Sequence, residues 1–176
     1  WRAFNYVHVI NIMRDMYLIQ KKNQIPYLRE STQYLKMAYE YTKAMFNYWM
    51  FPDGVGASEY GNMGEMTLPL YLAQDLEKEG FVQEAAEMNA IFDKKAHFFA
   101  SENFPFGSEM VYDSTAFEAV YGYGKRIQNE HIMKAAAKAS FANRGKQPVW
   151  YLYNTDVRGG GDTEWNTSYM TQLGAY

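Results

Sequence analysis

The chain has 176 residues, enough for one ordinary domain, with a net charge of −3 and 18% aromatic residues. This balance excludes the basic surface of a nucleic-acid-binding domain, and because no run of about 18 apolar residues occurs, we expect no membrane span. Cysteine is absent, which excludes disulfides, thiol nucleophiles and cysteine-type zinc sites.

Apolar residues at helical spacing predict six helices. They cover residues 3–20, 27–50, 67–79, 81–100, a segment that starts at Thr115, and 129–143. The clearest apolar stripe belongs to the helix over 81–100. The fifth helix should weaken at Gly122 and Gly124, and a last partial helix should follow Asn166.

Several residues are typical of helix ends. Pro26 suits the first turn of the second helix, and Gly80 suits the position that follows the third helix. Thr115 and Glu118 have the spacing of a capping box. We therefore interpret Glu118 as part of that cap rather than as a functional acid.

The predicted connectors alternate between short and long. Helices joined by short turns lie antiparallel, so the long connectors over 51–66, 101–114 and 144–165 should gather at one end of the molecule. Each is polar and contains glycine, and loops on a rigid scaffold often carry binding and catalysis. The sequence therefore predicts an all-α domain of repeated antiparallel α-hairpins over residues 1–176, with three loops on a single rim.

An acidic motif recurs in the long connectors roughly every 50 residues, a period typical of one repeated supersecondary unit. Each copy contains glycine, then serine or threonine, then glutamate, with an aromatic residue at or near the next position. The glutamates are Glu59, Glu109 and Glu164. If the three loops converge, these carboxylates share one cleft.

The second connector continues into the fifth helix with the sequence FGSEMVYDSTAFE over residues 106–118. This stretch resembles a poorly characterised bacterial family within the six-hairpin glycosidase-like group, whose fold is an (α/α)6 toroid. The resemblance implies hydrolysis of a glycosidic bond, commonly by an inverting pair of carboxyl groups roughly 6.5–9.5 Å apart. The chain has room for only about three and a half hairpins and begins at Trp1 rather than methionine. We therefore expect a partial toroid and a piece of a longer protein.

Glu109 is the first candidate for a catalytic carboxylate, because it lies between a glycine turn and a helix start among apolar residues. Burial raises the pKa of a carboxyl group and makes it a better acid catalyst at neutral pH. Glu164 is the second candidate and Glu59 the third. Structural roles remain open: Glu109 can accept hydrogen bonds from loop backbone, and Glu164 can lie in a surface turn near a helix N-terminus.

Residues beside these acids are candidates for binding a sugar through hydrogen bonds or ring stacking. They are Tyr60, Tyr112, Asp113, Trp150, Arg158, Asp162 and Trp165. Asp113 also suits a helix cap, and Arg158, which could clamp a carboxylate or phosphate, also suits a solvated surface. The three histidines at positions 8, 97 and 131 are too scattered for a metal motif, so we expect no metal and no cofactor.

Two other functions fit the same pattern. A polysaccharide lyase on a similar toroid could use Tyr112 as its base and Arg158 against a substrate carboxylate, whereas a helical-repeat binding protein would need no catalysis. In the glycosidase interpretation the partner is a carbohydrate and the location is secreted or periplasmic. Half a toroid would expose Leu68, Tyr71 and Leu72, so we also expect the rest of the toroid or a second copy of the chain as a partner.

Overall fold

A computed structural model describes residues 3–25, 27–48, 55–106 and 116–142, and every regular element in these ranges is helical. The elements are α1 (Ala3–Asn23), α2 (Ser31–Tyr48), α3 (Val55–Glu59), the π-helical turn η1 (Leu68–Leu72), α4 (Ala73–Lys78), α5 (Val82–Ser101), α6 (Ala116–Arg126) and α7 (Glu130–Ala142). The predicted all-α fold is confirmed. None of the described helices combines the length and apolarity that crossing a bilayer requires.

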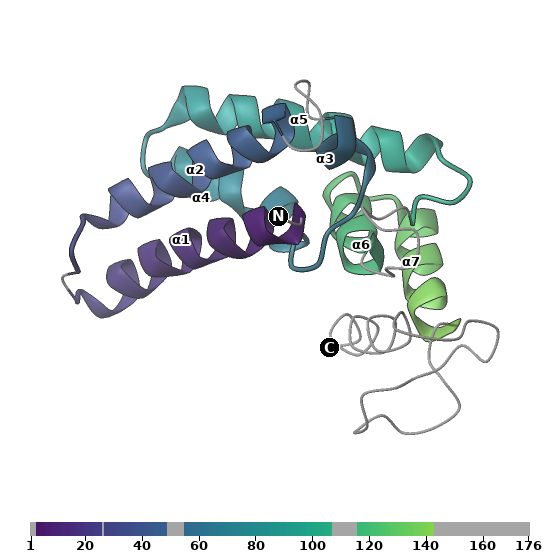
Figure 1. Cartoon of the computed structure of the whole chain (residues 1–176), viewed down its shortest axis with the longest axis horizontal. Helices are drawn as coiled ribbons and strands as arrows, with labels where there is room; N and C mark the ends of the chain where they lie inside the picture. Colours follow the sequence, from purple (N-terminus) through teal and green to yellow (C-terminus); the bar gives the residue numbers. More distant parts are fainter. Residues whose placement is uncertain (1–2, 26, 49–54, 107–115, 143–176) are drawn as a thin grey trace.

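Consecutive helices pack in pairs within the described ranges: α1 with α2, α4 with α5, and α6 with α7. The turns that join α1 to α2 and α4 to α5 lie on the same side of the molecule, at the left of Figure 1. The pair α6–α7 runs across the direction of α1, α2 and α5 (Figure 1). The predicted hairpins are therefore present, but the third pair does not repeat the orientation of the first two.

Three predicted helices have clearly different boundaries in the structure, and the first of them runs to Asn23 rather than ending at residue 20. The second begins at Ser31 rather than at 27, because Gln33 Oε1 accepts a hydrogen bond from the Glu30 amide at 3.1 Å and marks the start there; Leu28 is fully exposed. The helix predicted over 67–79 is divided into η1 and α4. Within the first long connector, α3 is a helix that the periodicity did not predict.

Glycines behave differently at the ends and in the middle of helices. Gly80 ends α4 as predicted, with φ of +82° and a hydrogen bond from the Phe81 amide back to the Leu76 carbonyl at 2.9 Å. The predicted weakening at Gly122 and Gly124 is wrong, since α6 continues through both to Arg126. A Cβ on Gly122 would lie 2.9 Å from Met66 Cα, so the missing side chain lets α6 approach the first connector closely.

The core contains the predicted stripe of α5. Its buried members are Ala85, Met88, Phe92, Ala96 and Phe99. The expectation of an exposed inner face is wrong for Leu68 and Leu72, which are completely buried, because η1 packs against both α5 and α6. Tyr71 is 43% exposed.

An ion pair joins the first helix to the fourth. Arg14 Nε and Nη2 lie 2.8 Å and 2.7 Å from Asp75 Oδ2, and the Asp75 side chain is only 6% exposed. The Arg14 guanidinium also lies over the Tyr71 ring, 5.2 Å from its centroid. Two guanidinium nitrogens therefore bind one carboxylate oxygen, and this charge-assisted contact links α1 to α4.

Candidate functional site

Two of the predicted site residues, Glu59 and Tyr60, lie in the described part of the chain. The others lie outside the described residues: Glu109, Tyr112, Asp113, Trp150, Arg158, Asp162, Glu164 and Trp165. The same holds for Pro26, for Thr115 of the expected capping box, and for the whole third connector.

Glu59 ends the short helix α3 and borders a pocket of about 340 Å³. Helix α2 contributes Phe46 and Asn47 to the lining, α3 contributes Ser58 and Glu59, and α5 contributes Ile91, Lys94, Lys95 and Phe98. The Glu59 side chain is exposed, so its carboxylate is accessible to a ligand. A volume of this size is within the range of small-molecule sites.

The lining of this pocket combines two kinds of surface. The half-buried Phe98 supplies aromatic surface, since Phe46 is only 5% exposed. Glu59, Asn47 and Ser58 supply a carboxylate, an amide and a hydroxyl, and Lys94 adds an exposed ammonium group. Flat apolar faces with a few polar groups around them suit a ligand that is itself apolar on one face and hydroxylated at its edge. Tyr60 does not line the pocket: it is half-buried and packs against the core.

Beneath the pocket lies a buried polar cluster of Asn62, Glu65, Lys95 and Tyr123. Each of these residues is at most 2% exposed. Lys95 Nζ donates to Glu65 Oε1 at 2.5 Å and to the carbonyls of Ala57 at 2.7 Å and Tyr60 at 2.6 Å. An ammonium group has three donors, so all three are satisfied.

The Glu65 carboxylate is also fully hydrogen-bonded. Glu65 Oε1 also accepts from the Tyr123 hydroxyl at 2.8 Å, and Oε2 accepts from the Asn62 amide and from Asn62 Nδ2, both at 3.0 Å. Four donors suit an ionised carboxylate, which only accepts. The cluster therefore contains a fully hydrogen-bonded ion pair inside the protein.

Burial and charge act on the titrating groups of this cluster. Burial lowers the pKa of Lys95 from its usual value, and the Glu65 carboxylate opposes that shift. Burial also raises the pKa of Tyr123 well above its usual value, and both the charge and the hydrogen bond of Glu65 add to the increase. Tyr123 is thus a permanent hydrogen-bond donor to Glu65.

Sequence reasoning missed this cluster although one signal was present. Lys95 follows Phe92 by three residues and precedes Phe99 by four, so it lies within the apolar stripe of α5. The ammonium lies 5.3 Å, 5.5 Å and 5.2 Å from the ring centroids of Phe46, Phe99 and Tyr123. A cation inside an apolar stripe indicates a buried partner.

A family of unknown function, DUF5695, matches residues 1–172. The chain belongs to the DUF5695 family. No curated protein and no solved structure matches it. The family name assigns no activity, so the function of this DUF5695 chain has to be argued from its geometry.

Glu118 of the DUF5695 chain is a further acid whose environment the sequence did not reveal. Its Oε2 accepts a hydrogen bond from the Gly64 amide at 3.1 Å, so it links α6 to the first connector as well as standing at the expected cap position. Burial raises the pKa of Glu118, the hydrogen bond from Gly64 opposes the shift, and the nearby charge of Glu65 adds to it. Gly64 is held on its other side by Asn11, whose Nδ2 donates to the Gly64 carbonyl at 2.9 Å.

The first long connector also touches the point where the second one ends. A Cβ on Gly61 would lie 2.7 Å from Ala116 Cα, and Ala116 is the first residue of α6. The first connector is therefore packed against the start of α6. The third connector lies outside the described residues.

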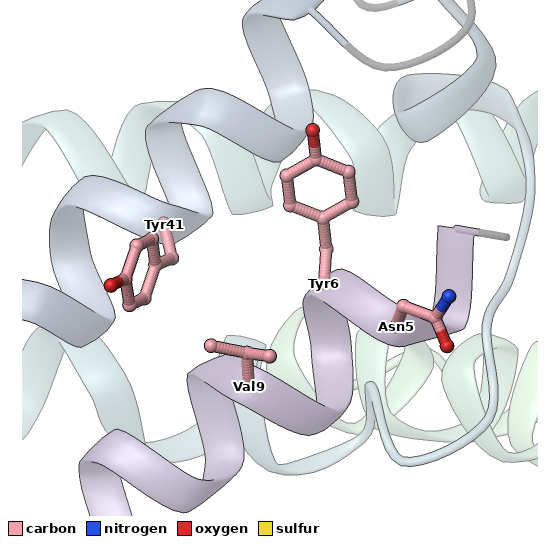
Figure 2. Close-up of a pocket in the computed structure, with 4 residues that line it drawn as sticks. All are labelled: Asn5, Tyr6, Val9 and Tyr41. Carbon is pink, nitrogen blue, oxygen red and sulfur yellow. The ribbon is translucent and has the colours of Figure 1, made fainter. Parts of the chain in front are cut away.

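Two other pockets of the DUF5695 chain contain no predicted site residue. One, of about 420 Å³, is lined by Asn5, Tyr6 and Val9 of α1 and by Tyr41 of α2 (Figure 2). Figure 2 shows the rings of Tyr6 and Tyr41 on facing helices, with the Asn5 amide turned away from both. This pocket is mostly apolar, and none of the described residues that line it is acidic.

The other pocket, of about 410 Å³, is lined by Pro69, Leu70, Tyr71, Gln74, Asp93, Lys125 and Arg126. Its main cation is already engaged: Arg126 donates to Asp93 Oδ1 at 2.7 Å, to the Pro69 carbonyl at 2.8 Å and to Asn89 Oδ1 at 2.8 Å. Among the described residues, no three histidines or acids are grouped as metal ligands. The Glu59 pocket is therefore the best candidate site in the described part of the chain.

Proposed function

We propose that this chain binds a carbohydrate and takes part in hydrolysing a glycosidic bond, with the Glu59 pocket as part of the substrate site. The observation that carries the proposal is the lining of this pocket, where an accessible carboxylate lies with Asn47, Ser58 and the half-buried ring of Phe98. Sugar rings have apolar faces that suit the ring of Phe98 and hydroxyl groups that suit the polar side chains. The resemblance of residues 106–118 to the six-hairpin glycosidase-like group supports the same chemistry.

We propose a separate role for each of two carboxyl groups, and the exposure of Glu59 decides which role it takes. Glu59 is exposed, which suits a carboxylate that accepts a proton from an attacking water. The second carboxyl group, which protonates the leaving oxygen, is proposed to be Glu109 or Glu164. In an inverting enzyme the two groups stand roughly 6.5–9.5 Å apart, which leaves room for the water.

A panel of oligo- and polysaccharides tests the proposal, with release of new reducing ends as the measurement. Glu59→Gln, Glu109→Gln and Glu164→Gln are compared with the wild type, and Glu40→Gln, on the exposed side of α2, is the matched control. Loss of a general acid or base lowers the rate by about 10²–10⁴-fold, and we expect this loss for Glu59→Gln but not for the control.

Each other outcome has a defined meaning. Full activity of Glu59→Gln would remove Glu59 from the mechanism. Unsaturated products that absorb in the ultraviolet would indicate the lyase alternative instead. If the wild-type chain neither binds nor cleaves any glycan of the panel, the carbohydrate proposal is rejected and the binding-protein alternative remains.

A further inference from the structure

The ammonium of Lys95 holds the backbone on both sides of Glu59. Its two carbonyl acceptors belong to Ala57, two residues before Glu59, and to Tyr60, one residue after it. Both hydrogen bonds are short, at 2.7 Å and 2.6 Å. The position of Glu59 therefore depends on a side chain from α5, more than thirty residues further along the chain.

The segment that carries Glu59 is short, and it is held by packing against α2 and α5 and by the hydrogen bonds from Lys95. Helix α3 has only five residues, and helices shorter than about 12 residues are marginal in water. The carbonyls at a helix C-terminus have no partners within the helix, and here the buried cation supplies them. The side chain of Lys95 is 1% exposed, so water cannot easily take its place.

The same ammonium connects this segment to two other parts of the fold. Through Glu65 Oε1 it reaches the Tyr123 hydroxyl on α6, and through Glu65 Oε2 it reaches Asn62 in the first connector. Lys95 also borders the pocket whose edge carries Glu59. The Lys95 ammonium thus links the edge of the pocket to α5, which carries Lys95, and to α6, which carries Tyr123.

We propose that Lys95 is a positioning residue that fixes the Glu59 carboxylate at the pocket by binding the two backbone carbonyls on either side of it. The functional part of this inference rests on the carbohydrate function proposed above. All three donors of Lys95 are used inside the protein, so in this proposal it acts through the backbone of residues 57–60. The positioning effect comes from the ammonium group of Lys95 and not from its apolar stem.

Because the chain contains no cysteine, the charge can be tested separately from the stem. A Lys95→Cys variant is unfolded in urea, alkylated at its single thiol and refolded. Reaction with 2-bromoethylamine displaces bromide and gives a thioether that ends in an ammonium group, one sulfur in place of one methylene of lysine. Reaction with bromoethane gives the same stem without the ammonium, and this neutral form is the matched control.

Hydrogen exchange of the amides of residues 56–60 is the first measurement, with the amides of α7 as the internal reference. Hydrogen bonds to a charged group are worth enough that their loss changes a local opening equilibrium by about tenfold or more. We expect exchange of residues 56–60 in the ethylated form to be faster by this factor than any change in the amides of α7, and we expect it to be restored in the aminoethylated form. Equal protection in the two forms would overturn the inference.

Steady-state kinetics on the glycan found active is the second measurement. A positioning role predicts that the ethylated form loses kcat by more than its KM changes, and that the aminoethylated form recovers kcat. If protection is lost but kcat stays at the wild-type value, Lys95 is structural and the inference fails. If the wild type has no carbohydrate activity, the proposed function fails, while exchange still decides whether the ammonium orders the Glu59 segment.

If neither alkylated form refolds, Lys95→Met combined with Glu65→Gln removes both buried charges, and faster exchange of residues 56–60 in that chain is again the expected result.

Discussion

Replacing Gly122 by alanine tests whether α6 is held close to the first connector by the missing side chain. A Cβ at this position would lie 2.8 Å from Met66 Cγ, 2.9 Å from Met66 Cα and 3.0 Å from the Met66 carbonyl oxygen. Two of these atoms are backbone, which cannot move aside as a flexible side chain can. The helix and the connector must therefore separate before the alanine fits.

The expected loss follows from two opposing contributions. Overpacking of a well-packed interior costs about 1–3 kcal/mol, whereas alanine gains about 1 kcal/mol over glycine inside a helix. Separation of α6 from Met66 would also disturb the neighbouring Glu65, which Tyr123 of the same helix contacts. We expect Gly122→Ala to lower the free energy of unfolding by about 1–2 kcal/mol.

Gly124→Ala is the matched control because it lies in the same helix and is also buried. Its Cβ would meet only side-chain atoms, Ile132 Cγ2 and Met133 Cγ, both at 3.2 Å, so a shift of a few tenths of an ångström suffices. The helix-propensity gain is the same, and we expect a change within about 1 kcal/mol of zero. Urea unfolding followed by circular dichroism measures both variants. A Gly122→Ala chain at least as stable as the wild type, or one that loses less than Gly124→Ala, would refute the close-packing argument.

Three further predictions concern the ion pair, a buried acid and a helix end. Lys95→Met leaves Glu65 buried without its cation and should cost about 3–5 kcal/mol; adding Glu65→Gln should recover part of this loss in urea unfolding, and strictly additive losses would contradict the pairing. The folded-state pKa of Glu118 is raised by burial, so the native state keeps its proton just above the usual carboxyl pKa and loses stability as pH rises through that window. Glu118→Gln should therefore gain stability relative to the wild type as pH rises from about 4.5 toward 7, and parallel stability curves for the two proteins would count against the buried carboxyl. Gly80→Ala has open space around its Cβ but a φ of +82°, so it should lose about 1 kcal/mol from the backbone alone, and an unchanged melting temperature would contradict this.

The helices were predictable where one face is buried uniformly along the whole element. In α5 the apolar residues between Ala85 and Phe99 that recur at helical spacing all face one core, so their spacing in the sequence predicts the helix correctly. Gly80 was predictable because a left-handed backbone after a helix admits few other residues. By contrast, α3 is held by tertiary contacts with Lys95 rather than by its own pattern, and no local signal indicates it.

The candidate pocket contains one of the two predicted site residues that the structure describes. Glu59 was singled out from a repeated motif and lies at a pocket. Its neighbour Tyr60 was assigned to substrate, but its side chain packs against the core and its carbonyl binds Lys95. The contacts of Glu65 and Lys95, and the bond from Gly64 to Glu118, join residues 30 and 54 positions apart. Charged residues that pair over such separations look like ordinary surface charges until the fold brings them together.

The π-helical turn η1 holds one more residue than an α-helical turn would, and this has a consequence for everything that follows it. Each residue of an α-helix rotates the next by about 100°, so shortening Leu68–Leu72 by one residue would swing α4 by that angle about its own axis. Asp75 would then leave the Arg14 guanidinium, and Leu76 would leave the interior. The extra residue is thus the rotational offset that lets η1 bury Leu68 and Leu72 while α4, which follows it, buries Asp75 against the first helix.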